Sequence, residues 1–361
     1  MKIAIITLND NNNYGNRLQN YAMEYLLKNY GEPHTIIRNI SWRKVSFVGK
    51  CLRQVKLDLD KYFGKCGLIY KTNRKRLLNF KKFNENINLN YKFKFKSTKI
   101  NDSFDFFVVG SDQIWNPLSY EQYGYVNFLQ FADANKRVAI APSIAKDSLT
   151  EEQIKILKES LKNFYYLSCR EQQGSNIITR LTGRECTTLI DPTLMLSTSD
   201  WNKVSKKPKY HDEHMKYILL YILGELTEEY KKIITDISNK YGLKIINISD
   251  KNSIYYTTGP SEFIYLISHC TIMLTDSFHG AVFSYIYNKP FRIFKRVNGM
   301  NMNSRLTNLI SVLHLGDLFI NENTSIEKIL ETNFDKSYLD VEQKKFKDYL
   351  NMVFYKEQQR D

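Results

Sequence analysis

The chain has 361 residues, of which 43% are hydrophobic and 14% aromatic. This composition excludes a wholly disordered chain and is sufficient for two domains, each with its own core. No apolar run approaches the roughly 18 residues of a membrane-spanning helix, and the N-terminal apolar run is too short for a signal peptide. We therefore expect a cytoplasmic protein.

The cysteines and histidines do not suggest a metal site. The five cysteines are odd in number and widely spaced, and none belongs to a C-x-x-C pair, so neither a disulfide framework nor a zinc site is predicted. Among the six histidines only His211 and His214 lie close together, in a stretch rich in Lys, Pro and Asp. We expect no metal and no cofactor.

The net charge of +14 is confined to one segment. Residues 41–100 hold 17 lysines and arginines against three acidic residues, so the remaining residues sum to zero. Aromatic residues are mixed with these cations, which fits a solvated helical insertion, a surface that lies on anionic lipid, or a nucleic-acid surface. We favour the first two, with contact at the inner face of the membrane, over nucleic acid.

The first half of the chain alternates predicted strands and helices. Residues 2–8 form an apolar strand and residues 9–15 a polar loop, and a helix with apolar residues at helical spacing runs from Asn16 to Gly31. The glycine-containing turn is not G-x-G-x-x-G, so dinucleotide binding is not predicted. Further strands are expected at 34–40, 104–109, 137–141, 164–168 and 187–190, and helices at 151–162 and 175–182.

The second half repeats this plan after a linker predicted at 197–215. Its expected strands are 217–223, 243–248, 271–275 and 291–295, and its expected helices are 227–242, 260–268, 304–315 and 338–357. The pattern predicts an α/β fold with two Rossmann-like domains facing a cleft, as in the GT-B architecture of many glycosyltransferases. We place the domains at 1–198 and 214–337, and expect residues 338–361 to pack back across both.

The stretch 271–291 carries the clearest chemical signal. An apolar strand ends at Asp276, and a helix starts near His279, so the turn between them points unpaired backbone N–H groups at the crevice where α/β sheets bind ligands. His279 can pair with phosphate or move a proton, and Gly280 permits close approach of a ligand or backbone. The alternative is a histidine that only caps the helix.

This stretch resembles the signature of the polysaccharide pyruvyl transferases. The sequence Asp-Ser-Phe-His-Gly at 276–280 is followed by an aromatic-rich helix and Asn-Lys-Pro-Phe. Three other stretches match in the same order, at 13–22, at 109–115, and at 168–171 with 191–192. The resemblance implies transfer of the enolpyruvyl group of phosphoenolpyruvate onto two hydroxyls of one sugar, which gives a cyclic pyruvate ketal and phosphate. The acceptor is expected in a cell-surface glycan, such as a capsule or exopolysaccharide, or in its lipid-linked precursor.

The resemblance also suggests roles for individual residues. It assigns Arg170 and His279 to the donor. Arg305 is expected to bind a second oxyanion, with Lys295 and Arg296 as rivals in the same region. The matching turns add the remaining expected substrate-binding residues: Ser277, Gly280, Gly15, Asn16, Arg17, Gln19, Ser111 and Gln113.

The general base is a separate question. Many members of the family carry an acidic residue where this chain has Asn16, so the proton must be accepted elsewhere. Candidates are Asp10, Asp112 and Asp276, of which we favour Asp112 because it follows a buried strand into a loop. Asp276 is also suited to orienting His279 or capping its helix.

Two other functions fit the same pattern. A glycosyltransferase with a nucleotide-sugar donor would place its phosphates on the same helix start. A non-catalytic member of an envelope-assembly complex would use the basic segment as its docking surface.

Overall fold

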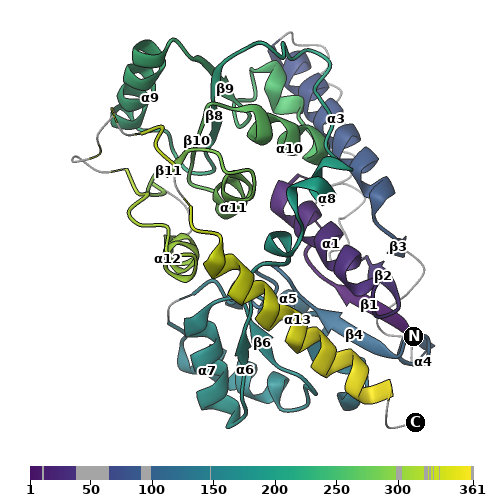
Figure 1. Cartoon of the computed structure of the whole chain (residues 1–361). Helices are drawn as coiled ribbons and strands as arrows, with labels where there is room; N and C mark the ends of the chain where they lie inside the picture. The colour runs from purple at the N-terminus through teal and green to yellow at the C-terminus, as the bar shows by residue number, and fades with distance from the viewer. Residues whose placement is uncertain are drawn as a thin grey trace.

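The computed structural model describes residues 1–9, 12–37, 65–90, 99–146, 148–297, 303–320, 324, 327, 329–332 and 334–358. Asp10 and most of the basic segment, residues 41–64 and 91–98, lie outside this description. The described residues form an α/β fold with two parallel sheets, as the sequence predicts (Figure 1).

The first domain is built on a five-stranded parallel sheet of order β3-β2-β1-β4-β5. The inner strand β4, next to the central β1, is apolar and fully buried, as expected of a parallel strand covered on both faces. A second pair of parallel strands, β6 and β7, follows in the chain. The strands are β1 (Lys2–Ile6), β2 (Glu32–Ile36), β3 (Leu89–Asn90), β4 (Phe106–Val109), β5 (Arg137–Ala139), β6 (Ser168–Cys169) and β7 (Thr187–Thr188).

Helices connect these strands. The first ends at Leu27, four residues before the glycine expected to end it, because β2 already begins at Glu32. A short helix before β4 and another after it were not predicted. The helices are α1 (Tyr14–Leu27), α4 (Lys99–Asp102), α5 (Tyr120–Asn127), α6 (Glu151–Leu161) and α7 (Gln172–Thr182).

The second domain has a four-stranded parallel sheet of order β11-β10-β8-β9. Thr227 caps α9 and Gly242 ends it in the left-handed conformation, as the sequence predicts. The strands are β8 (Tyr217–Tyr221), β9 (Lys244–Asn247), β10 (Ile272–Thr275) and β11 (Phe291–Ile293). The helices are α9 (Glu228–Tyr241), α10 (Pro260–His269), α11 (Phe278–Ile286) and α12 (Asn303–Val312).

The predicted linker at 197–215 contains a structured element. Residues of α8 (Thr198–Asn202) place Trp201 fully inside the core, where its ring lies 4.8 Å from that of Phe283. The Lys and Pro content of this stretch concealed its apolar side chains, of which Trp201 and Val204 are buried in the core.

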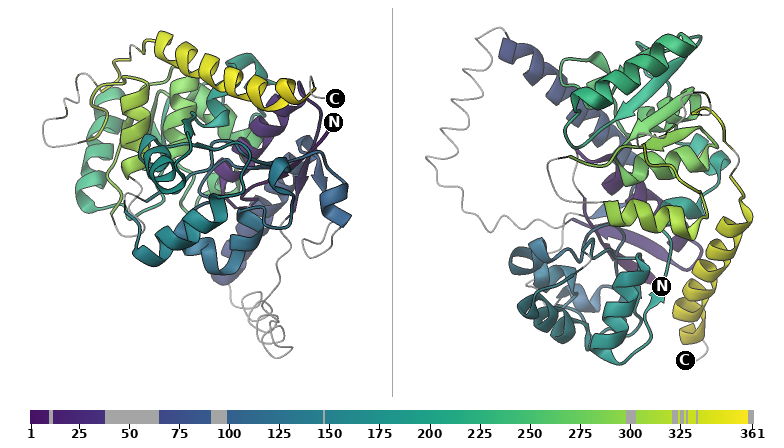
Figure 2. Two further views of the ribbon diagram at one scale, coloured as in Figure 1. Left: turned by 90° about the horizontal axis from the view of Figure 1, so that it is seen from below. Right: turned by 90° about the vertical axis from the view of Figure 1, so that its left-hand side faces the viewer.

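Two long helices cross between the domains. The C-terminal helix α13 (Ser337–Gln358) runs along the molecule (Figures 1 and 2). Its Tyr349 hydroxyl donates to the carbonyl of Ala139 in the first sheet, and the Lys336 amine before it donates to the carbonyl of Tyr285 in α11. Helix α3 (Lys65–Phe83) is the helical part of the basic segment, and it packs against the second domain at α10 and at the 3-10 helix Ile254–Thr257.

None of the described helices is long and apolar enough to cross a membrane.

Candidate functional site

The predicted site residues come from both domains and meet where the carboxyl ends of the two sheets face each other. Asn16 lies in the first turn of α1 and Asp112 in the loop after β4, while Arg170 follows β6 directly. From the second domain, His279 lies in the first turn of α11 and Arg305 in α12. All five side chains are buried.

His279 is held between the domains. Its Nε2 lies 3.6 Å from Oδ2 of Asp191, and the Ser277 hydroxyl caps its helix by accepting from the N–H of Gly280 at 3.4 Å. A Cβ added to Gly15 would lie 2.1 Å from Nδ1 of the ring. Gly15 is therefore needed for the imidazole to occupy this position.

Asp191 organises the first-domain side of the cluster. Its Oδ2 accepts from the Arg170 guanidinium at 2.6 Å and from the Ser111 hydroxyl at 3.2 Å, and its Oδ1 accepts from the backbone and hydroxyl of Thr193. Burial opposes ionisation, but His279, Arg170 and Thr193 outweigh it and hold the pKa of Asp191 below its ordinary value. Asp191 is thus a fixed anion.

No role was assigned to Asp191 from the sequence, although the Asp-Pro pair was among the matching motifs. Asp276 was the carboxylate expected to orient His279 or cap its helix. Instead, Asp276 accepts from the N–H groups of Leu223 and Gly224, both at 2.7 Å, and pairs with Arg296 at 3.0 Å. Asp276 directly follows β10, and Leu223 and Gly224 follow the neighbouring strand β8. The carboxylate therefore joins the ends of these two strands.

Asp112 is the acid at the centre of the cleft. Its Oδ2 accepts from Asn16 at 2.5 Å, and its Oδ1 lies 3.4 Å from Nη1 of Arg305 and 3.7 Å from Nη2 of Arg170. The backbone has φ 62°, which is uncommon for a residue other than glycine, although aspartate tolerates it better than most. It follows a cis peptide bond between Gly110 and Ser111. The Asn16 amide thus contacts the acid that we favour as the general base.

The two arginines share partners but differ in charge balance. Both guanidinium groups lie over the ring of Phe278, at 4.5 Å for Arg170 and 5.6 Å for Arg305. Burial lowers the pKa of Arg170, but Asp191, Glu171 and Asp112 raise it by more, so its pKa is above the ordinary value. Burial and the neighbouring charge of Arg170 lower the pKa of Arg305 to about 10. Gln113 is the other close partner of Arg305, because its amide oxygen can accept from both terminal nitrogens, at 2.7 and 2.9 Å.

Four buried nitrogen atoms in this cluster have no hydrogen-bond partner among the described residues. They are Nε and Nη2 of Arg170, Nε of Arg305 and Nε2 of His279. Leaving a buried polar group unpaired costs about 1–3 kcal/mol, and more if the group is charged. So many in one cluster indicate a site suited to an anion rather than a finished structural network.

The other predicted residues have supporting positions. Gln19 accepts from the N–H of Ser111 at 3.1 Å and donates to Thr7 at 2.8 Å, which ties α1 to the loop after β4. Arg17 turns away from the cluster toward Asn84 and the carbonyl of Leu8. A Cβ added to Gly280 would meet Thr275 Oγ1 at 2.6 Å, so this glycine allows α11 to approach β10.

The rivals of Arg305 lie elsewhere. Arg296 is paired with Asp276, and the side chain of Lys295 is exposed. The geometry therefore favours Arg305 as the second cation of the cleft.

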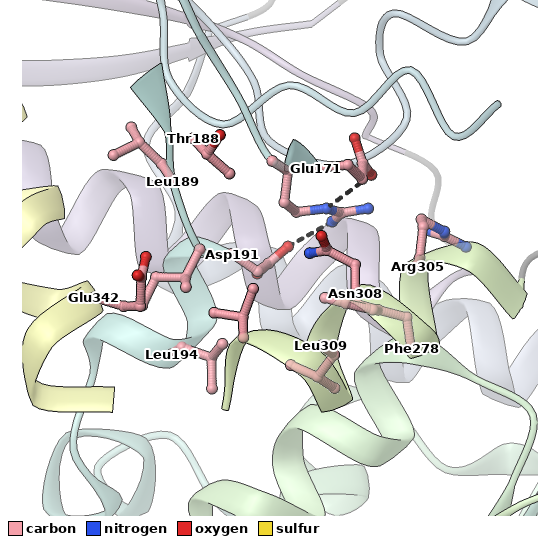
Figure 3. A pocket seen from close by; sticks show the side chains of 13 residues that line it. Glu171, Thr188, Leu189, Asp191, Leu194, Phe278, Arg305, Asn308, Leu309 and Glu342 are labelled. Atoms are coloured by element: carbon pink, nitrogen blue, oxygen red, sulfur yellow. Dashed lines mark hydrogen bonds and ion pairs between the residues drawn. The ribbon is translucent and has the colours of Figure 1, made fainter. Parts of the chain in front are cut away.

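A pocket opens beside the cluster between β7, α12 and α13. Figure 3 shows Asp191 and Glu171 on one side of it and Arg305 and Asn308 on the facing helix. Its lining includes the apolar Leu189, Leu194 and Leu309, together with Glu342 of α13. The buried cluster is thus reached from the junction of the two domains.

Comparison with known proteins agrees with this geometry. The family model described as polysaccharide pyruvyl transferase matches residues 13–296, and no curated protein matches the chain. Among solved structures, the UDP-GlcNAc 2-epimerase of Methanocaldococcus jannaschii has 15% sequence identity and a TM-score of 0.52 over 98% of this chain and 100% of that chain. A candidate UDP-N-acetylglucosamine 2-epimerase from Listeria monocytogenes has 10% identity and a TM-score of 0.50 over 95% and 90%.

At these identities the solved structures show the fold alone, which is the GT-B arrangement of two Rossmann-like domains. The family match covers every strand of both sheets except β1, and every residue of the cluster except Arg305. The chain therefore belongs to the polysaccharide pyruvyl transferase family.

Proposed function

We propose that this protein transfers the enolpyruvyl group of phosphoenolpyruvate to two hydroxyl groups of one sugar, forming a cyclic pyruvate ketal and releasing phosphate. The acceptor is a sugar of a cell-surface glycan or of its lipid-linked precursor, and the reaction takes place in the cytoplasm. The observation that carries this proposal is the set of four buried nitrogens on Arg170, Arg305 and His279 that make no hydrogen bond to a described residue. A small donor with both a carboxylate and a phosphate supplies the acceptors that these groups lack.

The cations bind the donor in this proposal. Asp191 fixes Arg170, whose Nε and Nη2 make no hydrogen bond and only the longer ion pairs with Glu171 and Asp112, at 3.6 and 3.7 Å. Arg305 offers Nε from the opposite domain. Their separate origins suit a donor with two anionic ends. Because both are buried, their attraction for an anion is stronger than it would be at an exposed surface.

Asp112 and His279 carry the proton transfers. A first sugar hydroxyl adds to C2 of the donor and gives its proton to Asp112, while His279 protonates the methylene carbon and turns it into a methyl group. A second hydroxyl then replaces the phosphate at C2 and gives its proton to His279, which closes the ketal and restores the protonated imidazole. Asp191 is unsuited to the role of base because His279, Arg170 and Thr193 hold its pKa below the ordinary value, despite the opposing effect of burial.

The nucleotide-sugar alternative rests on the GT-B fold, since the Methanocaldococcus epimerase was solved with UDP-GlcNAc and UDP. One incubation separates the two. Purified protein is mixed with phosphoenolpyruvate or with a panel of nucleotide sugars, together with free and lipid-linked sugar acceptors. We expect phosphate release and a pyruvylated acceptor mass only with phosphoenolpyruvate. Transfer from a nucleotide sugar, with no reaction of phosphoenolpyruvate, would refute the proposal.

A further inference from the structure

Helix α3 has two faces of different character. Its inner face, formed by Arg76, Phe80 and Phe83, is at most 5% exposed and packs into the protein. Its outer face exposes Leu77 by 44% and Leu78 by 48%. Arg74, Lys81 and Lys82 are also exposed, and with the two leucines they form what we call the outer α3 face.

The composition of this face is unusual for the molecule. Residues 74–82 contain no acidic residue, so its cations are not neutralised within the helix. On α6, by contrast, the exposed Ile156 lies in a helix that also contains Glu151, Glu152 and Glu159 along with two lysines. Exposed apolar side chains are common, but two adjacent leucines that share a helix face with Arg74, Lys81 and Lys82 combine the two features that favour contact with an anionic lipid surface. The exposed acid next in the chain, Glu85, follows only after the end of the helix.

We propose that the outer α3 face docks on a membrane that contains anionic lipid. The cations meet the headgroups and the leucines enter the boundary between headgroups and acyl chains. Nucleic acid would also attract the cations, but it offers nothing to bury the leucines. Each cation near an anionic surface contributes about sixfold in partitioning, so removal of two weakens binding about 30-fold.

The inner face of α3 holds the helix in a fixed position relative to both domains. The Arg76 guanidinium donates to Oδ1 of Asn12 at 2.7 Å and to the Tyr14 hydroxyl at 2.6 Å. It also donates to the carbonyl of Tyr256 in the second domain at 3.0 Å. Asn12 and Tyr14 lead directly into Gly15, which contacts His279. A surface bound to α3 is therefore held at a set position relative to both domains.

Vesicle sedimentation of the full-length protein tests the docking surface without reference to catalysis. Vesicles of phosphatidylglycerol and phosphatidylcholine are compared with vesicles of phosphatidylcholine alone, at low and high salt. We expect binding to the mixed vesicles, weakened by salt. The variant K81Q/K82Q should bind about 30-fold more weakly, and L77S/L78S should also bind more weakly while keeping its salt dependence.

The matched control is K155Q/K158Q, which removes two exposed lysines from α6. It should bind like the unmodified protein, and thermal melts should show that all variants remain folded. Absence of vesicle binding, equal binding to vesicles without anionic lipid, or equal losses in the control would overturn the proposal. Binding of single-stranded RNA in place of vesicles would overturn it as well.

Discussion

The two sides of the cleft differ in charge. The first-domain side contributes three carboxylates, Asp112, Glu171 and Asp191, around a single Arg170. The second-domain side contributes His279 and Arg305, because its own carboxylate, Asp276, is already engaged by Arg296 and two backbone N–H groups. The contacts Asp112–Arg305 and Asp191–His279 therefore join the domains.

This difference separates the groups that hold the site from those that await a ligand. Arg170 has enough negative charge around it to raise its pKa, whereas the pKa of Arg305 is lowered to about 10 by burial and by Arg170. A bound anion would add negative charge next to Arg305, on the second-domain side, where the protein supplies less of it. Substitutions on each side should accordingly have different effects.

The largest expected effect follows from removing the imidazole. His279→Ala should lower kcat by about 10² to 10⁴-fold, the usual contribution of a general acid or base, while the fold remains intact. Phosphate release from phosphoenolpyruvate measures it. His211→Gln is the control, because that histidine is also buried but lies in the linker before the second domain, where it contacts Tyr255. Normal turnover of the His279 variant would reduce the residue to a structural role.

The prediction from sequence succeeded where the information was local. The strand, turn and helix around His279 were predicted because residues 272–286 carry their own apolar spacing, and Ser277 is a typical cap. The pairing of His279 with Asp191 was missed because the two meet only when the domains pack together. Asp276 was the nearer candidate in sequence, and its partners are backbone groups that carry no sequence signal.

The next effect concerns stability. Asp191→Asn removes the buried anion opposite Arg170 and His279, and should destabilise the protein by about 3 kcal/mol at pH 7. Urea unfolding measures this difference. Because the folded-state pKa of Asp191 is depressed, the carboxylate stabilises the fold above its unfolded pKa of about 4, and this contribution is lost as pH falls. The difference in free energy of unfolding between the unmodified protein and Asp191→Asn should therefore narrow below about pH 5. A difference that stays constant with pH would contradict the role of Asp191 as a buried anion.

A smaller effect is expected from adding one methyl group. Gly15→Ala places a Cβ 2.1 Å from Nδ1 of His279, so the ring must move, at a cost of about 1–3 kcal/mol. We expect kcat to fall about tenfold or more. Gly124→Ala is the control, since that glycine also lies in a helix and its Cβ would meet only Phe128, at 3.9 Å. Equal activity of the two variants would show that the position of the ring does not matter.

The smallest expected effect appears at alkaline pH and tests the weaker side of the cleft. With an Arg305 pKa of about 10, kcat/KM for phosphoenolpyruvate should decline above that pH as the guanidinium loses its charge in the free enzyme. Arg305→Lys should move this decline to lower pH, because lysine starts from an ordinary pKa of about 10.4 and meets the same burial and the same Arg170. This decline at alkaline pH reflects weaker binding of the donor. Saturating phosphoenolpyruvate should therefore suppress it, and kcat should change less with pH than kcat/KM. If the unmodified protein and Arg305→Lys show the same dependence of kcat/KM on alkaline pH, the group that titrates is not Arg305. The negative charge that stabilises Arg305 would then come from the protein and not from the donor.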